Sequence, residues 1–260
     1  MIDFSGKRGL ILGVGNQRSI AWAVVERLHQ QGAELGLTFL RDPKGRFEAN
    51  VRKLGEQTSA TLIAECDVAS DESIEALIKQ VNDQWGELDF LVHSLAYADT
   101  QDLSKPFSET LRDGFNKAME ISAYSLLPLA KGVIPMMRRR GGGSIVSMSF
   151  IGSTLAVPNY NVMGPAKAAL ESCTRYLARE LGPENIRINS LSPGAIRTLS
   201  SAGIKDISEM IRVAGEHSAM KRTATQAEVA NTAAFLLSDA ASGITGQLIY
   251  VDCGYSIMAN

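Results

Sequence analysis

SMSFIGSTLAVPNYNVMGPAKAALESCTRYLARE, residues 147–180, is the stretch of sequence that decides the fold. It leaves an apolar run, turns after Pro158 and enters a helical pattern that Gly164 and Pro165 open, since proline is well tolerated in a first helical turn. The apolar residues of that pattern recur at helical spacing and predict one apolar face: Ala166, Ala169, Leu170, Cys173, Tyr176, Leu177 and Leu181. A strand end, a turn and an amphipathic helix form one unit of an alternating α/β chain.

Two polar side chains mark the start of this helix. Lys167 follows Tyr160 by seven positions, and two helical turns place both side chains on one face, about 10 Å apart along the axis. The lysine stem is long enough to lean back toward the phenol. A nearby ammonium favours the phenolate, so the tyrosine could serve as an acid or hydrogen-bond donor. For an isolated pair, a half-buried turn aromatic and a solvated lysine is the more ordinary interpretation.

Outward from this unit, short apolar runs alternate with helical patterns along the chain. The runs predict strands at residues 8–13, 33–40, 60–68, 88–95, 144–149, 187–191 and 247–251. The helical patterns between them include residues 21–31, 74–85, 112–140 and 226–237. We found no linker or repeat. The pattern therefore predicts one doubly wound, Rossmann-type α/β domain over residues 1–260, with a mostly parallel sheet of about seven strands and helices on both faces.

The first strand ends in a glycine turn. Gly13-Val14-Gly15 leads to Ser19-Ile20 and then to a helix. Such a turn presents backbone N–H groups and a helix N-terminus, which suit a pyrophosphate. The usual third glycine is missing, so the turn alone indicates either a dinucleotide site or a structural connection.

The ends of the second and third strands bear on the choice of nucleotide. An acidic residue at the end of the second strand would favour NAD, but Leu40 stands there. Arg41 follows and is a candidate partner for a 2′-phosphate, whereas Asp42 would repel a phosphate or neutralise that arginine. Asp67 and Val68 are expected to reach the adenine through side chain and backbone, and Asp67 also suits a helix N-cap.

Later segments extend the expected site. Ser94 and Leu95 end the fourth strand, in a run of small residues where a nucleotide could pass close to the backbone. Ile196 and Thr198 leave the sixth strand at a turn. Residues 199–219 are helical in pattern but mixed in polarity, which predicts a substrate-binding lid at about residues 197–215.

The composition excludes several classes of protein. The chain has 260 residues, is 45% hydrophobic and 21% charged, and has a formal net charge of −2. This balance gives no electrostatic surface for nucleic acid or an anionic membrane. Its three cysteines are too scattered for a disulfide framework or a zinc site, so we expect no metal. No apolar run approaches the length of a membrane span, and no signal-peptide segment is seen, which predicts a cytoplasmic protein.

Several motifs occur in a characteristic order along the chain: Gly13 with Ser19-Ile20-Ala21, Cys66-Asp67-Val68, His93-Ser94, Tyr160-Asn161-Val162-Met163-Gly164, Ala166-Lys167-Ala168, Ile196-Arg197-Thr198 and Gly243-Ile244-Thr245-Gly246. The combination resembles the short-chain dehydrogenase/reductase superfamily and, within it, the divergent branch of enoyl-acyl-carrier-protein reductases of type II fatty acid synthesis. The similarity runs from Gly6 to Met258. Its most specific part is the Tyr-x6-Lys spacing, because the wider superfamily has Tyr-x3-Lys.

The resemblance implies a function and a set of site residues. It implies an oxidoreductase that transfers hydride from NADH to the 2,3 double bond of an enoyl thioester on acyl carrier protein, with NADPH not excluded, and a homotetramer. The implied catalytic residues are Tyr160 and Lys167, and Lys167 would also hold the nicotinamide ribose. The implied cofactor-binding residues are Gly13, Ser19, Ile20, Asp67, Val68, Ser94, Leu95, Lys167, Ile196 and Thr198. The implied substrate-binding residues are Ala98, Phe150 and Tyr160.

Two departures from that pattern keep alternatives open. Phe150 stands where this branch often has a second tyrosine, and Ser192-Pro193-Gly194 looks more like the general superfamily. Ser147 precedes Tyr160 by thirteen positions, a spacing that resembles the superfamily's catalytic serine. The second hypothesis is therefore a carbonyl reductase or alcohol dehydrogenase that uses Ser147 or Ser149. The third is a nucleotide-binding regulator that kept the fold and lost turnover.

Overall fold

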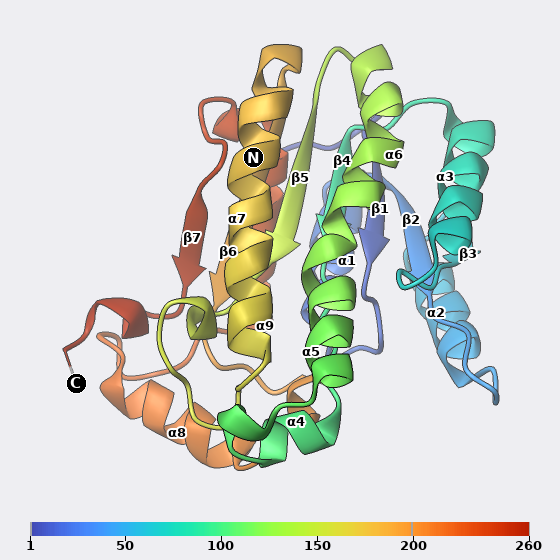
Figure 1. Cartoon of the computed structure of the whole chain (residues 1–260). Helices are drawn as coiled ribbons and strands as arrows, with labels where there is room; N and C mark the ends of the chain where they lie inside the picture. The colour runs from blue at the N-terminus through green and yellow to red at the C-terminus, as the bar shows by residue number, and fades with distance from the viewer. Residues whose placement is uncertain (1, 199, 260) are drawn as a thin grey trace.

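A seven-stranded sheet forms the centre of the protein, with the strand order β3-β2-β1-β4-β5-β6-β7. The computed structural model describes residues 2–198 and 200–259 (Figure 1). The strands are β1 Arg8–Leu12, β2 Glu34–Phe39, β3 Leu62–Glu65, β4 Phe90–His93, β5 Gly143–Met148, β6 Ile186–Pro193 and β7 Leu248–Val251. All neighbouring strands are parallel. The predicted Rossmann-type sheet is thus confirmed, although β3 is shorter than its apolar run.

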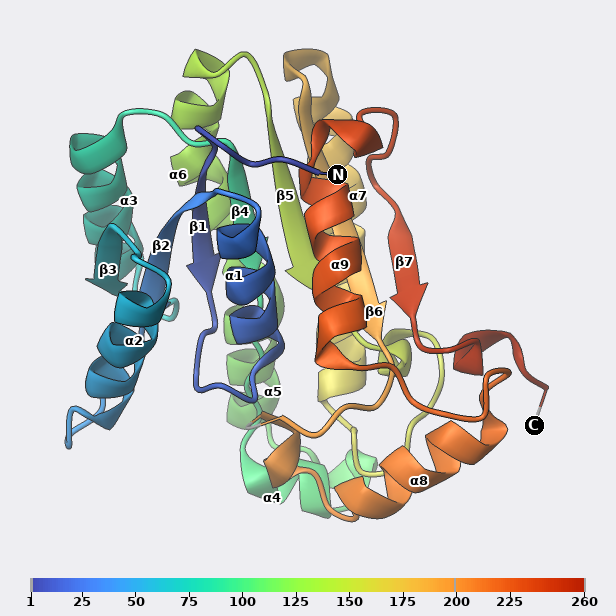
Figure 2. The ribbon, with the colours of Figure 1, turned by 180° about the vertical axis from the view of Figure 1, so that it is seen from behind.

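Helices cover both faces of the sheet. One face carries α3 Asp71–Trp85, α5 Arg112–Met119, α6 Leu126–Arg139 and α7 Met163–Leu181 (Figure 1). The opposite face carries α1 Ile20–Gln30, α2 Arg46–Gln57 and α9 Gln226–Leu237 (Figure 2). Two further helices, α4 Thr100–Ser104 and α8 Ile207–His217, lie beyond the carboxyl ends of the strands. Short 3-10 turns occupy Phe107–Glu109, Ile151–Ser153, Gly182–Glu184, Ser200–Gly203, Asp239–Ala241 and Tyr255–Ile257.

The core is divided by the sheet into two apolar layers. Successive strand side chains point to opposite faces, so Leu10 and Leu12 of β1 join the layer under α3, α6 and α7. Ile11 between them joins the layer under α1 and α9, together with Trp22. Because both faces of each strand are covered, the strands are continuous apolar runs rather than alternating ones.

The predicted helix at residues 112–140 is interrupted in the structure. A π-helical turn, Glu120–Tyr124, separates α5 from α6. The hydroxyl of Ser122 in this turn accepts the Tyr97 N–H at 3.0 Å. Ser125, which follows the turn, donates to the Ile121 carbonyl at 2.7 Å. The helical periodicity of the sequence therefore continues through this turn. The wider π-helical backbone places its hydroxyl groups against the end of β4.

The N-cap predicted at Asp67 is wrong, because Ser70 caps α3. The Ser70 hydroxyl accepts the Ser73 N–H at 3.2 Å. Asp67 instead accepts the Ala69 N–H at 3.0 Å, within the loop before the helix. Asp67 is therefore exposed at the carboxyl edge of the sheet.

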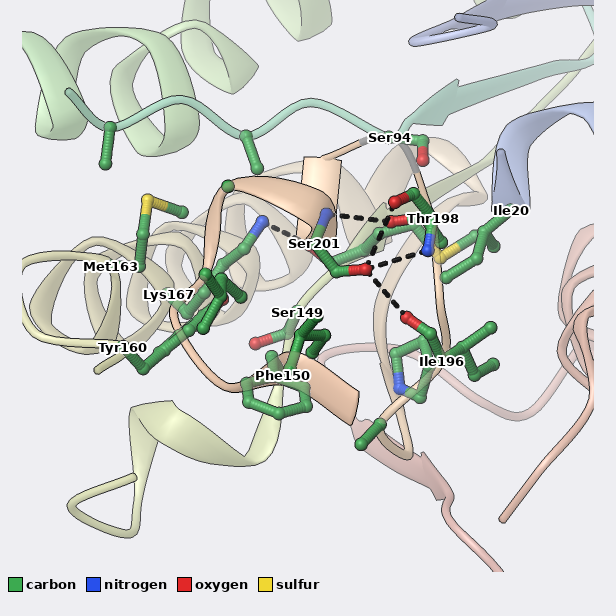
Figure 3. Close-up of a pocket in the computed structure, with 18 of the residues that line it drawn as sticks. Ile20, Ser94, Ser149, Phe150, Tyr160, Met163, Lys167, Ile196, Thr198 and Ser201 are labelled. Carbon is green, nitrogen blue, oxygen red and sulfur yellow. Dashed lines mark hydrogen bonds between the residues drawn. The ribbon is translucent and has the colours of Figure 1, made fainter. Parts of the chain in front are cut away.

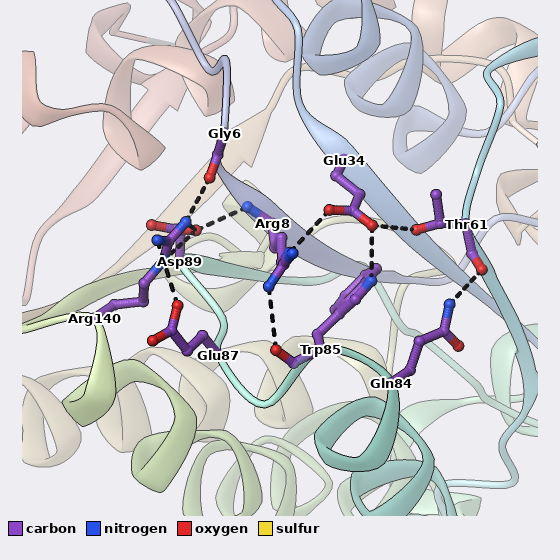
Figure 4. Close-up of polar contacts among 9 residues, drawn as sticks. All are labelled: Gly6, Arg8, Glu34, Thr61, Gln84, Trp85, Glu87, Asp89 and Arg140. Atoms are coloured by element: carbon purple, nitrogen blue, oxygen red, sulfur yellow. Dashed lines mark hydrogen bonds and ion pairs between the residues drawn. The ribbon is translucent and has the colours of Figure 1, made fainter.

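The amino edge of the sheet is joined by a polar cluster (Figure 4). The Asp89 carboxylate accepts the Arg8 N–H at 2.8 Å and the Arg140 guanidinium at 2.9 Å. Arg8 donates through Nε to Glu34 at 2.8 Å, and Trp85 donates its indole N–H to the same carboxylate at 3.0 Å. These contacts join β1, β2 and the ends of α3 and α6. The opposite, carboxyl edge is the one that holds the large cavity.

No helix among the described residues is long and apolar enough to cross a membrane.

Candidate active site

A cavity of about 300 Å³ opens at the carboxyl edge of the sheet (Figure 3). Its floor comes from the segments that follow β1, β4, β5 and β6. The chain winds in opposite directions from β1 and β4, which are neighbours in the sheet. In open α/β sheets a crevice at such a switch point is the usual place for a ligand.

Most of the residues singled out from the sequence meet in this cavity. Eleven of them line it: Gly13, Ser19, Ile20, Ser94, Leu95, Ala98, Phe150, Tyr160, Lys167, Ile196 and Thr198. Asp67 and Val68 do not line it. They follow β3, at the edge of the sheet two strands away from β1. Their predicted contact with adenine therefore stays a prediction about a part of the ligand outside this cavity.

Lys167 is held in the wall of the cavity by two main-chain carbonyls. It lies in the second turn of α7 and is 3% exposed. Its ammonium donates to Met148 O at 2.7 Å and to Leu95 O at 3.1 Å, so it joins the ends of β5 and β4. Burial lowers the pKa of Lys167 to about 8, and the Glu171 carboxylate opposes the change. A solvated helix lysine is thereby excluded.

Tyr160 lies in the turn before α7, and its side chain is 7% exposed. Burial raises the pKa of the phenol, and the Glu171 carboxylate raises it further. The net shift of this pKa is opposite to the one predicted from the Lys167 ammonium, because burial and Glu171 dominate. The phenol stays protonated and is available as a hydrogen-bond donor to a ligand in the cavity.

The Tyr160 ring is fixed by contacts on two sides. Phe150 packs against it with the ring centroids 4.7 Å apart and the planes inclined by 56°. Gly152 lies under the ring, where a Cβ would come within 2.4 Å of the Tyr160 Cδ1. Any larger residue at position 152 would displace the ring. Phe150 thus provides an apolar wall where a second tyrosine would have offered a hydroxyl.

The two serines considered for a carbonyl reductase have different surroundings. Ser147 is buried, and its hydroxyl bonds Ser190 at 2.8 Å and Thr174 at 3.3 Å, between β5, β6 and α7. It does not line the cavity. Ser149 does line it, but its hydroxyl donates to the buried carboxylate of Glu171. The serine at the superfamily spacing is therefore turned away from the ligand.

The glycine turn lets a phosphate group come close to the protein main chain. Gly13 has a φ of 96°, and a Cβ there would come within 1.9 Å of Ser94 O. Ser19 caps α1 by accepting the Trp22 N–H at 3.2 Å. Gly13 and Ser19 both line the cavity. A glycine turn, a helix N-terminus and a buried ammonium match the groups that hold a pyrophosphate and a ribose. The residues present therefore fit a nicotinamide dinucleotide.

Beyond β2, the candidate cation for a 2′-phosphate already has a partner. The Arg41 guanidinium lies 2.5 Å from the Glu65 carboxylate, the last residue of β3. Asp42 pairs with Arg46 at 3.6 Å. Of the two roles predicted for Asp42, the neutralisation of Arg41 is wrong, because the next strand supplies that carboxylate, and the repulsion of a phosphate stays a prediction. Leu40 is 50% exposed at the end of β2.

The predicted lid contributes an apolar wall, although its residue 199 lies outside the described part of the chain. Ile204, Ile207 and Met210 line the cavity. The start of the segment is held by reciprocal bonds. The Thr198 N–H donates to Ser201 Oγ at 2.7 Å, and the Ser201 N–H donates to Thr198 Oγ1 at 3.0 Å (Figure 3).

Glu171 is the main polar residue that sequence reasoning missed. It is 6% exposed and follows Lys167 by one helical turn. Its position on the sheet-facing side of α7 was a usable signal, because a carboxylate is rarely buried without a partner. Among the described residues, no group of three or more His, Cys, Asp or Glu could hold a metal ion.

Comparisons with known proteins agree with this geometry. The profile of the family described as "Enoyl-(Acyl carrier protein) reductase" matches residues 13–256. The enoyl-(acyl-carrier-protein) reductase (NADH) of Synechocystis sp. is 51% identical over 258 residues, which is 99% of both chains.

Solved structures of similar proteins superpose over nearly the whole chain. The reductase of Anaplasma phagocytophilum in complex with NAD is 39% identical, with a TM-score of 0.93 over 99% of this chain and 96% of that one. The Bacillus cereus reductase with NADP+ and an indole naphthyridinone is 41% identical, with a TM-score of 0.95 over 100% of each chain.

Proposed function

Because the chain belongs to the enoyl-(acyl carrier protein) reductase family, we propose that it reduces the 2,3 double bond of an enoyl thioester on acyl carrier protein in fatty acid elongation, with NADH as the hydride donor. The observation that carries the proposal is the meeting of Tyr160 and Lys167 in one cavity at the switch point of the sheet. Of the two serines considered for a carbonyl reductase, Ser147 does not line that cavity, and Ser149 lines it but donates its hydroxyl to Glu171.

Tyr160 stabilises the charge that develops during the reduction. NADH, when bound, supplies the hydride that C3 of the enoyl group accepts. The electron pair of the double bond then moves toward the thioester carbonyl, whose oxygen becomes negative. The protonated phenol of Tyr160 donates a hydrogen bond to that oxygen, at the point where the charge appears. C2 subsequently takes a proton that comes from solvent water, which completes the saturated thioester.

Lys167 binds and orients the cofactor. Its ammonium is anchored by Leu95 O and Met148 O, which leaves its third proton for a ribose hydroxyl. The positive charge also offsets the negative charge of the enolate oxygen. Gly13, Ser19 and Thr198 surround the place where a pyrophosphate would meet the N-terminus of α1.

The rest of the cavity suits an acyl chain. Its apolar walls come from Phe150, Met163, Ile204, Ile207 and Met210. An apolar channel with few polar groups holds an alkyl chain by burial alone. Ala98 lines the same space with a small apolar side chain.

The test is NADH oxidation with crotonyl thioester compared with a panel of ketones. We expect rapid oxidation with the thioester and little with any ketone. Turnover of ketones alone would favour the carbonyl reductase. Binding of NADH without any turnover would instead make the chain a nucleotide-binding regulator.

We also infer that the protein is a cytoplasmic homotetramer. The inference rests on the family resemblance and on large apolar side chains left in solvent, such as Tyr176 at 74% and Ile257 at 79% exposure. Light scattering should give four times the mass of one chain, and a monomer would contradict the assembly.

A further inference from the structure

We propose that Asn159 and Asn161 are positioning residues for Tyr160, which tie the phenol to the two walls of the acyl pocket. The inference rests on the proposed function, because it concerns the orientation of the group that stabilises the enolate. Neither asparagine lines the cavity. In this proposal their effect on the reaction passes through the residue between them.

The backbone around Tyr160 has an unusual conformation on both sides. Asn159 has a φ of 61° and Asn161 a φ of 42°. Both values lie in the left-handed region, which is costly for most side chains and is tolerated best by glycine, asparagine and aspartate. Two such residues that flank one tyrosine define the direction of its Cα–Cβ bond.

Asn161 joins this turn to α4. Its side-chain amide donates to Lys105 O at 2.8 Å and to Asp102 O at 3.1 Å. Both carbonyls lie at the C-terminal end of α4, where helix carbonyls lack donors within the helix. Leu103 of the same helix lines the cavity and packs with Tyr160 in one apolar cluster.

Asn159 joins the other side of the turn to the predicted lid. Its side-chain amide donates to Lys205 O at 3.2 Å. Lys205 stands between Ile204 and Ile207, two residues that line the cavity. The turn is therefore bonded on one side to α4 and on the other side to the segment that leads into α8.

The orientation of the phenol depends on the hydrogen bonds of Asn159 and Asn161, because no hydrogen bond holds the phenol itself. Within the described part of the chain, the Tyr160 hydroxyl has no hydrogen-bond partner. The ring is held by packing alone, on Phe150, over Gly152 and in the apolar cluster that includes Leu103. Its hydroxyl position thus follows the backbone of the turn. A closing lid would reach that backbone through Asn159.

The test is Asn161→Gly, with Asn185→Gly as the matched control. Glycine adopts the left-handed conformation without strain, so this variant removes the side-chain bonds and keeps the turn. Asn185 has a φ of 57° and donates to Gly141 O at 3.1 Å, at the opposite edge of the sheet. We expect a loss in kcat of about tenfold or more for Asn161→Gly, since a small misplacement at the reacting centre can cost up to ~10² in rate. We expect no loss in the control. The Kd for NADH should stay within twofold in both.

A double-mutant cycle separates positioning of the phenol from a general loss of structure. In a Tyr160→Phe background, Asn161→Gly should lower kcat no further, because the hydroxyl that it positions is already absent. Asn159→Gly should cost more with a long-chain enoyl thioester, which contacts the lid, than with crotonyl thioester. An equal loss with and without the phenol, or unchanged kcat in Asn161→Gly, would overturn the proposal. Absence of enoyl reduction in the parent protein would instead refute the proposed function.

Discussion

Burial acts in opposite directions on the two central residues of the site. It raises the pKa of the Tyr160 phenol and lowers the pKa of Lys167 to about 8, because each neutral form is easier to bury than its charged form. Tyr160 is thereby kept as a donor. Lys167 remains protonated below that pH, where its ammonium is compensated by carbonyl dipoles.

Removal of the phenol should affect turnover more than binding. We expect Tyr160→Phe to lower kcat by about 10²–10³, the usual cost of one lost donor to a developing oxyanion. The Kd for NADH should change little. Steady-state kinetics with crotonyl thioester and a fluorescence titration with NADH measure the two quantities. Unchanged turnover would remove the phenol from the mechanism.

Removal of the ammonium should affect the nucleotide first. We expect Lys167→Ala to weaken NADH binding, because we propose that the lost group holds the ribose. In the parent protein the affinity should fall as the pH rises above about 8, where Lys167 loses its proton. The protonated form of Lys167 should bind NADH better, so deprotonation should weaken the complex. A titration between pH 7 and pH 9 should show this slope in the parent only. The same slope in Lys167→Ala would assign the titration to another group.

Cofactor preference should depend on the ion pair between Arg41 and Glu65. We expect kcat/KM to be higher for NADH than for NADPH, since a 2′-phosphate must compete with Glu65 for the arginine. Glu65→Gln should move the ratio toward NADPH. Glu48→Gln, which breaks the similar Arg52 pair on α2, should not. A tenfold preference for NADPH in the parent, about 1.4 kcal/mol, would mean that Arg41 serves the ribose phosphate.

At the scale of elements, the π-helical turn Glu120–Tyr124 connects the helical layer to the site. Nε2 of His93, at the end of β4, lies 2.8 Å from Ser125 Oγ. The Ser125 hydroxyl donates to Ile121 O, so His93 carries its proton on Nε2. Burial lowers the pKa of His93 to about 3, and the nearby Lys167 lowers it further. His93 is therefore neutral where it lies near Lys167.

The lid is the element that we expect to move. Residues 197–215 should exchange their amide hydrogens slowly only after cofactor and an acyl analogue are added, because the segment contributes Ile204, Ile207 and Met210 to the wall of an open cavity. Hydrogen exchange followed by mass spectrometry measures this directly. The interior helix α9 provides the internal reference, because its protection should not change. Strong protection of the segment in the free enzyme would contradict a lid.

At the scale of the whole molecule, the two edges of the sheet have separate tasks. The carboxyl edge holds the cavity, and the amino edge holds the polar cluster around Asp89. The Asp89 side chain is 9% exposed. It forms ion pairs with Arg140 and Lys7 and accepts a hydrogen bond from the Arg8 N–H. The rigid amino edge keeps the strands in register, so the loops at the other edge are free to carry the chemistry.

This separation predicts a variant that loses stability without losing function. Asp89→Asn should lower the free energy of unfolding by about 1–3 kcal/mol, because the partly buried Arg140 guanidinium loses the nearer of its two carboxylates and keeps only Glu87. kcat/KM should not change. Urea unfolding at one fixed protein concentration measures the difference. Asp83→Asn, which breaks an exposed pair with Lys79, should cost less than about 1 kcal/mol. Equal effects of the two variants would show that Asp89 contributes no more than a surface charge.

The order of strands and helices followed from the sequence, because apolar runs and helical periodicity are local properties of the chain. α9 begins and ends at the predicted residues, where Thr225 caps it by accepting the Glu228 N–H. The spacing of Tyr160 and Lys167 also lies within one stretch. Periodicity was less informative on α7, where the predicted apolar residue Tyr176 is 74% exposed and the sheet-facing side includes Glu171.

Contacts between distant segments were decided only by the tertiary structure. Lys167 meets Leu95 and Met148 because β4 and β5 end side by side, which no local pattern reveals. Arg41 pairs with Glu65 instead of its neighbour Asp42, because parallel pairing of β2 and β3 brings their ends together. Ser147 turns away from the cavity because Ser190 and Thr174 satisfy its hydroxyl. The sequence determined the order of the strands and helices, and the packing of the sheet determined which of the predicted site residues meet.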